Sequence, residues 1–160
     1  MDAIAQVTGA APTSWESPGL TETEVTLDLL RKNGIEYVAD WVIDDLPQDV
    51  ETEHGTLTLL PYTVELNDVV MFAVQQHESD QFLKRGMAQF DRLYRESAVN
   101  ARIMAISIHP YLTGVPHRIR YLEELLDYVL GHADVIALTA SEIGTWYRRE
   151  MARTTALTAR

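Results

Sequence analysis

The sequence predicts an α/β fold in which parallel strands are joined by crossover helices. In the second half of the chain, segments with helical spacing of apolar residues alternate with short apolar runs of strand length. A strand, a crossover helix and a second strand form a parallel pair, either in a layered sheet or in part of a barrel. At 160 residues, 46% of them hydrophobic, the chain has the size of one domain, and we expect a single domain over 1–160.

The first half carries several boundary signals. Residues 1–20 are rich in Ala, Gly, Pro, Ser and Thr and are expected to be irregular. Residues 21–24 (Thr-Glu-Thr-Glu) fit a capping box at the start of a helix, which Asn33 and Gly34 end. Short strands are expected over 35–39 and 56–60, with an acidic loop between them.

The second half adds three helices and two strands. We expect a helix from Ser79, a strand ending at His109, a helix over 116–130, a strand over 135–138, and a last helix that begins with a capping box at Thr139 and Glu142. The tail over 153–160 is expected to be flexible.

Composition excludes several function classes. The formal net charge of −11, from 24 acidic and 13 basic side chains, disfavours binding to nucleic acid or to an anionic membrane. The absence of cysteine excludes disulfides and thiolate chemistry. No leader-like start and no membrane-length apolar segment is visible, so a cytoplasmic location is the default expectation.

His109 is the first candidate for chemistry. It lies at the C-terminal end of an expected strand, where parallel α/β folds place catalytic groups, and imidazole moves protons near neutral pH. The alternative is a histidine that is simply hydrogen-bonded in a turn. His117 and Arg118 open the next helix, where they either bind a ligand or lie on the surface.

Two further polar clusters follow expected strands. Carboxylates and an indole come together in the first, which either binds a ligand or cation or forms a hydrated loop: Asp40, Trp41, Asp44 and Asp45. The second either fixes a ligand by directional hydrogen bonds or forms an Asx-type turn: Tyr62, Glu65, Asn67 and Asp68.

Taken together, these segments resemble the C-terminal part of a polysaccharide deacetylase-like protein, in the branch similar to metal-independent allantoinases. The resemblance extends from about Val7 to Arg149. It rests on residues 8–9, 15–23, 37–41, 44–45, 60–68, 109–119 and 142–147, in that order.

This resemblance implies an incomplete, distorted (β/α) barrel and the hydrolysis of carbon–nitrogen amide bonds in N-acetylated sugars or small cyclic amides. It gives His109 the role of general acid, and Asp40 is the second candidate catalytic residue. Trp15, Ser17 and Pro18 match one wall of the substrate groove. Glu16 departs from the basic or apolar residue expected there.

The early family motifs, an aspartate pair and a zinc-holding histidine motif, have no counterpart before Val7. The chain resembles the family without its first half, so we expect no metal site and no cofactor unless a partner supplies zinc ligands. It is then either a hydrolase incomplete as an isolated chain, or a non-catalytic remnant that binds carbohydrate or a small molecule or serves as an oligomeric interaction module. An exposed sheet edge favours a homo-oligomer or a partner chain that covers it.

Overall fold

The structure is a computed structural model that describes residues 1–158, with side chains as far as Arg153. The chain divides into two compact units. Unit 1 comprises Met1–Pro61 and Leu138–Arg160, and unit 2 comprises Tyr62–Ala137. Each unit is described by itself, and the single domain expected over 1–160 stays a prediction.

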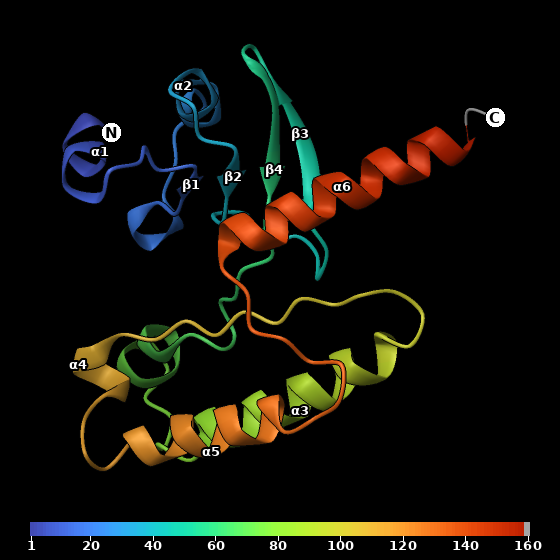
Figure 1. The fold of residues 1–160 in the computed structure, drawn as a ribbon. Helices are drawn as coiled ribbons and strands as arrows, with labels where there is room; N and C mark the ends of the chain where they lie inside the picture. Colours follow the sequence, from blue (N-terminus) through green and yellow to red (C-terminus); the bar gives the residue numbers. More distant parts are fainter. Residues whose placement is uncertain (159–160) are drawn as a thin grey trace. The chain divides into compact units, whose positions relative to one another are not determined.

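Unit 1 is built on a mostly parallel sheet (Figure 1). Its strands lie in the order β1 (Ser14–Trp15), β2 (Tyr37–Val38), β4 (Gly55–Leu59), β3 (Gln48–Thr52). The pairs β1–β2 and β2–β4 are parallel, as expected, whereas β3 and β4 form an antiparallel hairpin. A loop was expected where β3 lies. In β3 exposed and half-buried residues alternate, which is typical of an edge strand with one solvent-exposed face.

The core of unit 1 lies between the sheet and helix α2 (Thr26–Lys32). Its buried members are Leu30, Ile35, Val38, Leu57 and Leu59. The β3–β4 turn requires Gly55, whose φ of 105° disfavours any residue with a Cβ.

The last helix, α6 (Ala140–Thr158), also packs on this sheet. At Gly144 a Cβ would overlap the ring of Tyr37, so glycine permits the close approach. Arg148 donates to the Glu36 carboxylate at 2.6 Å and lies over the Tyr37 ring, 4.7 Å from its centroid. These contacts fix the helix against β2.

Unit 2 contains four helical segments: the π-helical η2 (Val69–Val74), α3 (Gln81–Glu96), α4 (Pro110–Thr113) and α5 (Ile119–Leu130). Its core is formed by Leu66, Met71, Phe72, Phe82, Leu122 and Leu125. Both long helices present apolar residues at helical spacing, which explains why α3 and α5 pack against each other.

Several local expectations were wrong. Asp2–Thr8 forms the short helix α1 and Pro18–Leu20 a 3₁₀ turn, although irregular chain was expected over 1–20. The first predicted helix begins only at Thr26. No strand forms over 135–138, and the predicted strand before His109 is reduced to one bridge, between Asn67 and Ser107.

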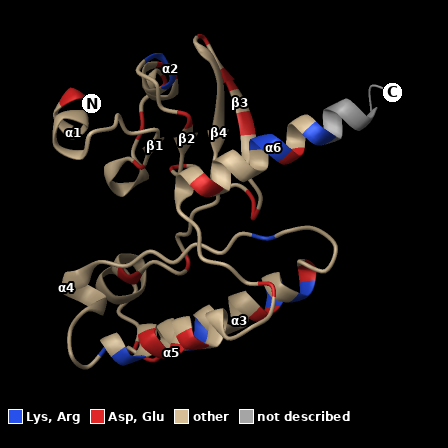
Figure 2. Ribbon diagram, viewed as in Figure 1, with Lys and Arg blue, Asp and Glu red and all other residues tan. Residues whose placement is uncertain are grey.

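The end of the chain differs as well. Helix α6 continues to Thr158, so most of the tail expected to be flexible over 153–160 is helical, and its last two residues lie outside the described part. Acidic side chains mark α5 and β3 (Figure 2). Within residues 1–158, none of the helices has the length and apolar character that crossing a membrane requires.

Candidate functional site

His109 lies at the junction between an extended segment and helix α4. Ser107 pairs with Asn67 through a parallel bridge, and His109 itself is extended, with φ −121° and ψ 125°. Pro110 then begins α4, because its fixed φ suits the first position of a helix and no backbone N–H is needed there. This strand-to-helix junction holds His109 at a defined point of the backbone.

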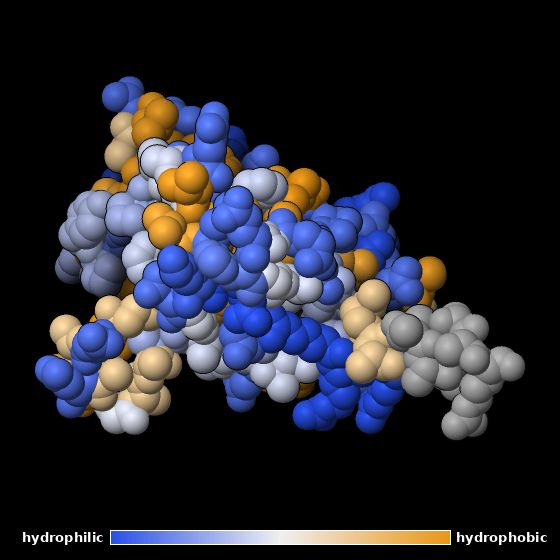
Figure 3. Space-filling view, turned by 90° about the horizontal axis from the view of Figure 1, so that it is seen from above, coloured by the Kyte–Doolittle hydropathy of each residue, from blue (hydrophilic) through white to orange (hydrophobic). Residues whose placement is uncertain are grey.

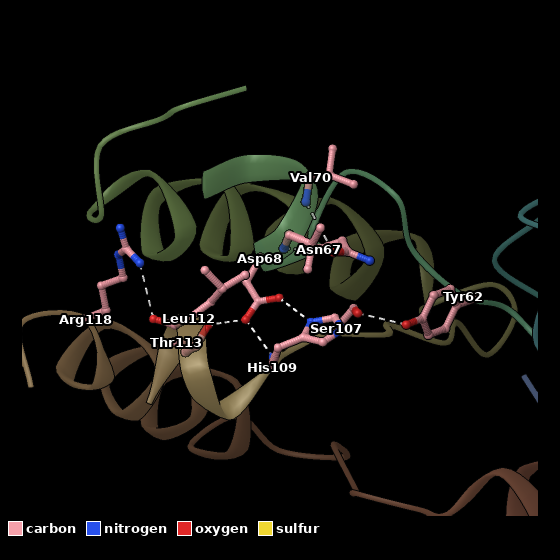
Figure 4. A network of polar contacts seen from close by, with 10 residues as sticks. Tyr62, Asn67, Asp68, Val70, Ser107, His109, Leu112, Thr113 and Arg118 are labelled. Atoms are coloured by element: carbon pink, nitrogen blue, oxygen red, sulfur yellow. Dashed lines mark hydrogen bonds and ion pairs between the residues drawn. The ribbon is translucent and has the colours of Figure 1, made fainter. Parts of the chain in front are cut away.

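The buried carboxylate of Asp68 is the centre of the site. It accepts hydrogen bonds from the His109 backbone N–H at 2.6 Å, from His109 Nδ1 at 2.7 Å and from Thr113 Oγ1 at 2.6 Å. Figure 4 shows the carboxylate between these two residues. Asp68 is fully buried, and a buried carboxylate is stable only when such donors replace its water.

The orientation of the His109 ring follows from this contact. Since Nδ1 donates to Asp68, Nε2 is the nitrogen left to exchange a proton. Within the described residues Nε2 has no hydrogen-bond partner, and the side chain is 40% exposed. Tyr111 contacts the ring edge to face, with centroids 5.6 Å apart. The site therefore presents a fixed histidine with one accessible nitrogen.

The other predicted residues of this segment make local contacts or are exposed, and ligand binding by them stays a prediction. Asn67 Oδ1 accepts the N–H groups of Val69 at 3.0 Å and Val70 at 3.4 Å, so the Asx-turn alternative applies to it. The Tyr62 hydroxyl lies 2.7 Å from Ser107 Oγ (Figure 4). Glu65 is exposed.

Arg118 braces the same unit. Its guanidinium lies over the Phe72 ring, 4.6 Å from the centroid, and Nη1 donates to the Leu112 carbonyl at 3.3 Å. It therefore joins η2 to α4, the helix that follows His109. His117 is exposed and makes no side-chain hydrogen bond within the described part of the chain.

The predicted groove wall lies in unit 1. Trp15 Nε1 donates to Ser17 Oγ at 2.9 Å, and the Ser17 backbone N–H donates to Asp40 Oδ1 at 2.6 Å. Pro18 begins the 3₁₀ turn. A hollow of about 140 Å³ borders Trp15 and includes Ala39 and Tyr37 in its lining.

The acidic loop after β2 exposes Trp41 and Asp44. Asp44 accepts the Asp45 backbone N–H at 2.6 Å and the Gln48 side-chain amide at 3.2 Å. These contacts form a local turn. Substrate binding by Trp41, Asp44 and Asp45 stays a prediction.

Asp68 and His109, predicted as separate site residues, are brought together in unit 2, whereas Asp40 belongs to unit 1. Across residues 1–158, no three His, Cys, Asp or Glu side chains are arranged to hold a metal ion. The expectation of a site without metal or cofactor stays a prediction.

Sequence reasoning missed Thr113 and Glu22. Thr113 lies in the short helix α4, which was not predicted, so the sequence carried no signal for its contact with Asp68. Glu22 carried no signal, because its partner Asp40 belongs to a different segment of the chain.

Proteins with similar sequences include two named as deacetylases. No family model matches the sequence. A Schizosaccharomyces pombe protein named as a polysaccharide deacetylase is 31% identical over 156 residues, which cover 87% of this chain and 48% of that protein. The peptidoglycan deacetylase of Helicobacter pylori is 21% identical, over 89% of this chain and 59% of its own length. The chain spans about half the length of these curated relatives.

Solved structures share the fold. The crystal structure of a Pseudomonas aeruginosa PAO1 protein, named as a polysaccharide deacetylase, matches 93% of this chain and 50% of that protein's chain, with a TM-score of 0.84 and 28% identity. The Puue allantoinase matches 89% and 48%, with a TM-score of 0.81 and 26% identity. These matches confirm the predicted α/β fold of the polysaccharide deacetylase type, a partial (β/α) barrel. The chain is thus similar to proteins named as polysaccharide deacetylases, which it matches over about half of their length.

Proposed function

We propose that this chain forms part of a deacetylase-like hydrolase of carbon–nitrogen amide bonds, in which His109 is the general acid. The observation that supports the proposal is the contact of His109 Nδ1 with the buried Asp68 carboxylate, at 2.7 Å. The substrate class is an N-acetylated sugar or a related small cyclic amide, by similarity to the deacetylases and the allantoinase.

The reaction needs a proton at the departing nitrogen. Water adds to the amide carbonyl, and the tetrahedral intermediate collapses only when the amine leaves, which requires protonation of its nitrogen. His109 donates that proton from Nε2 while the carbon–nitrogen bond breaks, giving the carboxylic acid and the amine. Asp68 keeps Nδ1 protonated and the ring fixed, a positioning role like that of the aspartate in a catalytic triad.

The proposed reaction also needs a base that accepts a proton from the attacking water. Asp40 is the candidate from the sequence. Its carboxylate is 5% exposed and already accepts the Ser17 N–H, which argues for a supporting role. A base from outside the described residues then completes the reaction, in keeping with a chain half as long as its relatives.

The test is turnover by the purified chain with chitin oligomers and with allantoin, with and without added zinc, measured as release of acetate or ureide. His109→Ala is expected to reduce turnover by about 10²-fold or more, the usual scale for a general acid. His54→Ala is the matched control, because that histidine is exposed and is not among the candidate site residues.

An unchanged rate in His109→Ala would remove this residue from the mechanism. If the folded chain shows no turnover, activity by the chain alone is refuted. Titration calorimetry with the same chitin oligomers then tests the alternative, a non-catalytic carbohydrate-binding module, for which binding without turnover is the expected result.

A further inference from the structure

Two acidic side chains of unit 1, the half-buried Glu22 and the buried Asp40, act on each other. Asp40, directly after β2, is 5% exposed, and only its Oδ1 has a donor, the Ser17 backbone N–H at 2.6 Å. Asp40 Oδ2 and Glu22 Oε1 are both buried, and neither has a hydrogen-bond partner among the described residues. Glu22 lies in the segment that leads from the 3₁₀ turn into α2.

A single proton held between the two carboxyl groups supplies the hydrogen bond that both oxygens lack. A protonated Glu22 has an O–H to donate, and an ionised Asp40 has a free acceptor. With both groups ionised, two negative charges face each other in a poorly solvated place, which is strongly unfavourable. With one proton between them, both buried oxygens are satisfied.

The protonation of Glu22 fits this arrangement. Burial, the hydrogen bond that a protonated Glu22 donates to Asp40, and the charge of Asp40 raise the pKa of Glu22 from 4.5 to about 7, against a smaller lowering by Trp41. Asp40 is the one titratable group, in the part of the chain that the structure describes, whose charge acts on Glu22. The charged groups nearest in sequence, Glu16 and Glu24, are exposed.

The turn between Ser17 and Glu22 is conformationally strained. Gly19 has φ 65° and Leu20 has φ 54°, a region that a leucine adopts only at a cost. The Ser17 N–H holds one end of this turn to Asp40, and Glu22 follows its other end. Both ends thus depend on the same aspartate.

We propose that Glu22 and Asp40 share one proton and act as a clamp, which holds the strained turn from Ser17 to Glu22 against the end of β2 and releases it when the proton leaves. The occupant of the site is a proton, and the response is a loosening of the segment next to Trp15 as pH rises. This inference concerns unit 1 alone and does not depend on the proposed hydrolase activity.

The direction of the pH effect follows from the shift. The folded state binds the Glu22 proton more tightly than the released state does, so the clamp is fully formed below about pH 4.5 and is lost as pH rises through about 7. The reverse slope, a clamp that strengthens with rising pH, is incompatible with a shared proton.

Amide hydrogen exchange of Ser17 in the whole chain, followed by NMR, measures the clamp directly. After correction for the intrinsic exchange rate, protection should fall about tenfold per pH unit between about pH 5 and 7, the slope of a one-proton linkage, and then level off. In Glu22→Gln the amide donates to Asp40 at every pH, so protection should not depend on pH. Glu16→Gln removes an exposed charge of the same segment and should retain the wild-type slope.

Protection of Ser17 that is independent of pH in the wild-type chain would overturn the proposal, as would an unchanged slope in Glu22→Gln. Carbon-13 titration of the Glu22 carboxyl in the wild-type chain covers the case in which the variant does not fold. A midpoint near 7 supports the clamp, whereas a midpoint near the ordinary value of 4.5 refutes it.

Discussion

At the scale of single residues, Asp68 determines how His109 is presented. One carboxylate receives a backbone N–H, a ring nitrogen and a hydroxyl, which leaves little freedom for the ring or for the first turn of α4. The ring is accessible because, among the described residues, its hydrogen bond is with Asp68 on the buried side. Accessibility and fixed orientation, both required of a general acid, therefore come from one buried neighbour.

Thr113 is the residue that tests this arrangement without touching the histidine. Thr113→Val keeps the shape of the side chain and removes the hydroxyl that donates to Asp68 at 2.6 Å. Because the acceptor is charged and buried, we expect the free energy of unfolding to fall by about 1.5–3 kcal/mol, measured by urea denaturation. Thr113→Ser keeps the hydroxyl and should lose clearly less stability. Equal losses in the two variants would show that the hydroxyl does not matter.

The sequence marked Asp68 and His109 as candidates, but it did not predict their contact. Both Asp68 and His109 were candidates because each follows an apolar segment, but nothing in the pattern joins two positions that are 41 residues apart. Arg118 was expected either to bind a ligand or to lie on the surface, and ligand binding stays a prediction; its contacts with the Phe72 ring and the Leu112 carbonyl were not foreseen. Tertiary contacts of this kind have no local signature.

At the scale of helices and strands, two similar capping patterns had different outcomes. At α6 the pattern was right: Thr139 N–H donates to Glu142 Oε2 at 2.7 Å, and this contact lowers the pKa of Glu142. At residues 21–24 it was wrong, because the Thr21 hydroxyl donates back to the Gly19 carbonyl at 3.2 Å. The Thr21 hydroxyl is therefore not available as a helix cap, and the helix begins later, at Thr26.

The failed strand over 135–138 has a different cause. Its apolar residues suit a strand, but a strand also needs a neighbour to pair with, and none is available to it in the described chain. Ile136 is accordingly 74% exposed. An apolar run shows which residues favour extended structure, whereas pairing depends on where the rest of the sheet lies.

Packing of α3 on α5 gives the prediction at this scale. Gly86 faces Leu125, and a Cβ there would lie 2.5 Å from Leu125 Cδ2. Leu125 is fully buried and has little room to move, so Gly86→Ala should lower the free energy of unfolding by about 1–3 kcal/mol. Denaturation followed by circular dichroism measures it. Leu125→Ala removes the side chain that the new Cβ would meet, so Gly86→Ala should cost less stability in that background than in the wild-type chain. If the two losses simply add, the contact is contradicted.

At the scale of the whole molecule, charge and exposed apolar surface act in opposite directions. The net charge of −11 keeps copies of the chain apart. Apolar residues nevertheless reach the surface, and Figure 3 shows them as patches between hydrophilic side chains. Trp41, Val42 and Ile43 are three exposed apolar residues in succession. Association then depends on how far salt screens the charge.

The edge of the unit 1 sheet is where we propose that association occurs. Strand β1 is terminal in the described sheet. The carbonyls of Thr13 and Trp15 accept hydrogen bonds from the β2 segment, at 2.8 Å from Glu36 N and 3.0 Å from Ala39 N. Since backbone groups alternate in direction along a strand, those of Ser14 face away from β2 and can pair with another chain.

We therefore expect a dimer or larger oligomer in light scattering, with association stronger at high salt because screening reduces the repulsion between acidic copies. Ser14→Pro removes the outward N–H and should shift the chain toward monomer, whereas Ser14→Thr keeps the N–H and should associate as the wild type does. Circular dichroism of both variants separates loss of association from loss of fold. A chain that is monomeric at every concentration and salt would refute the prediction, and association that is unchanged in a folded Ser14→Pro would place the contact elsewhere than β1.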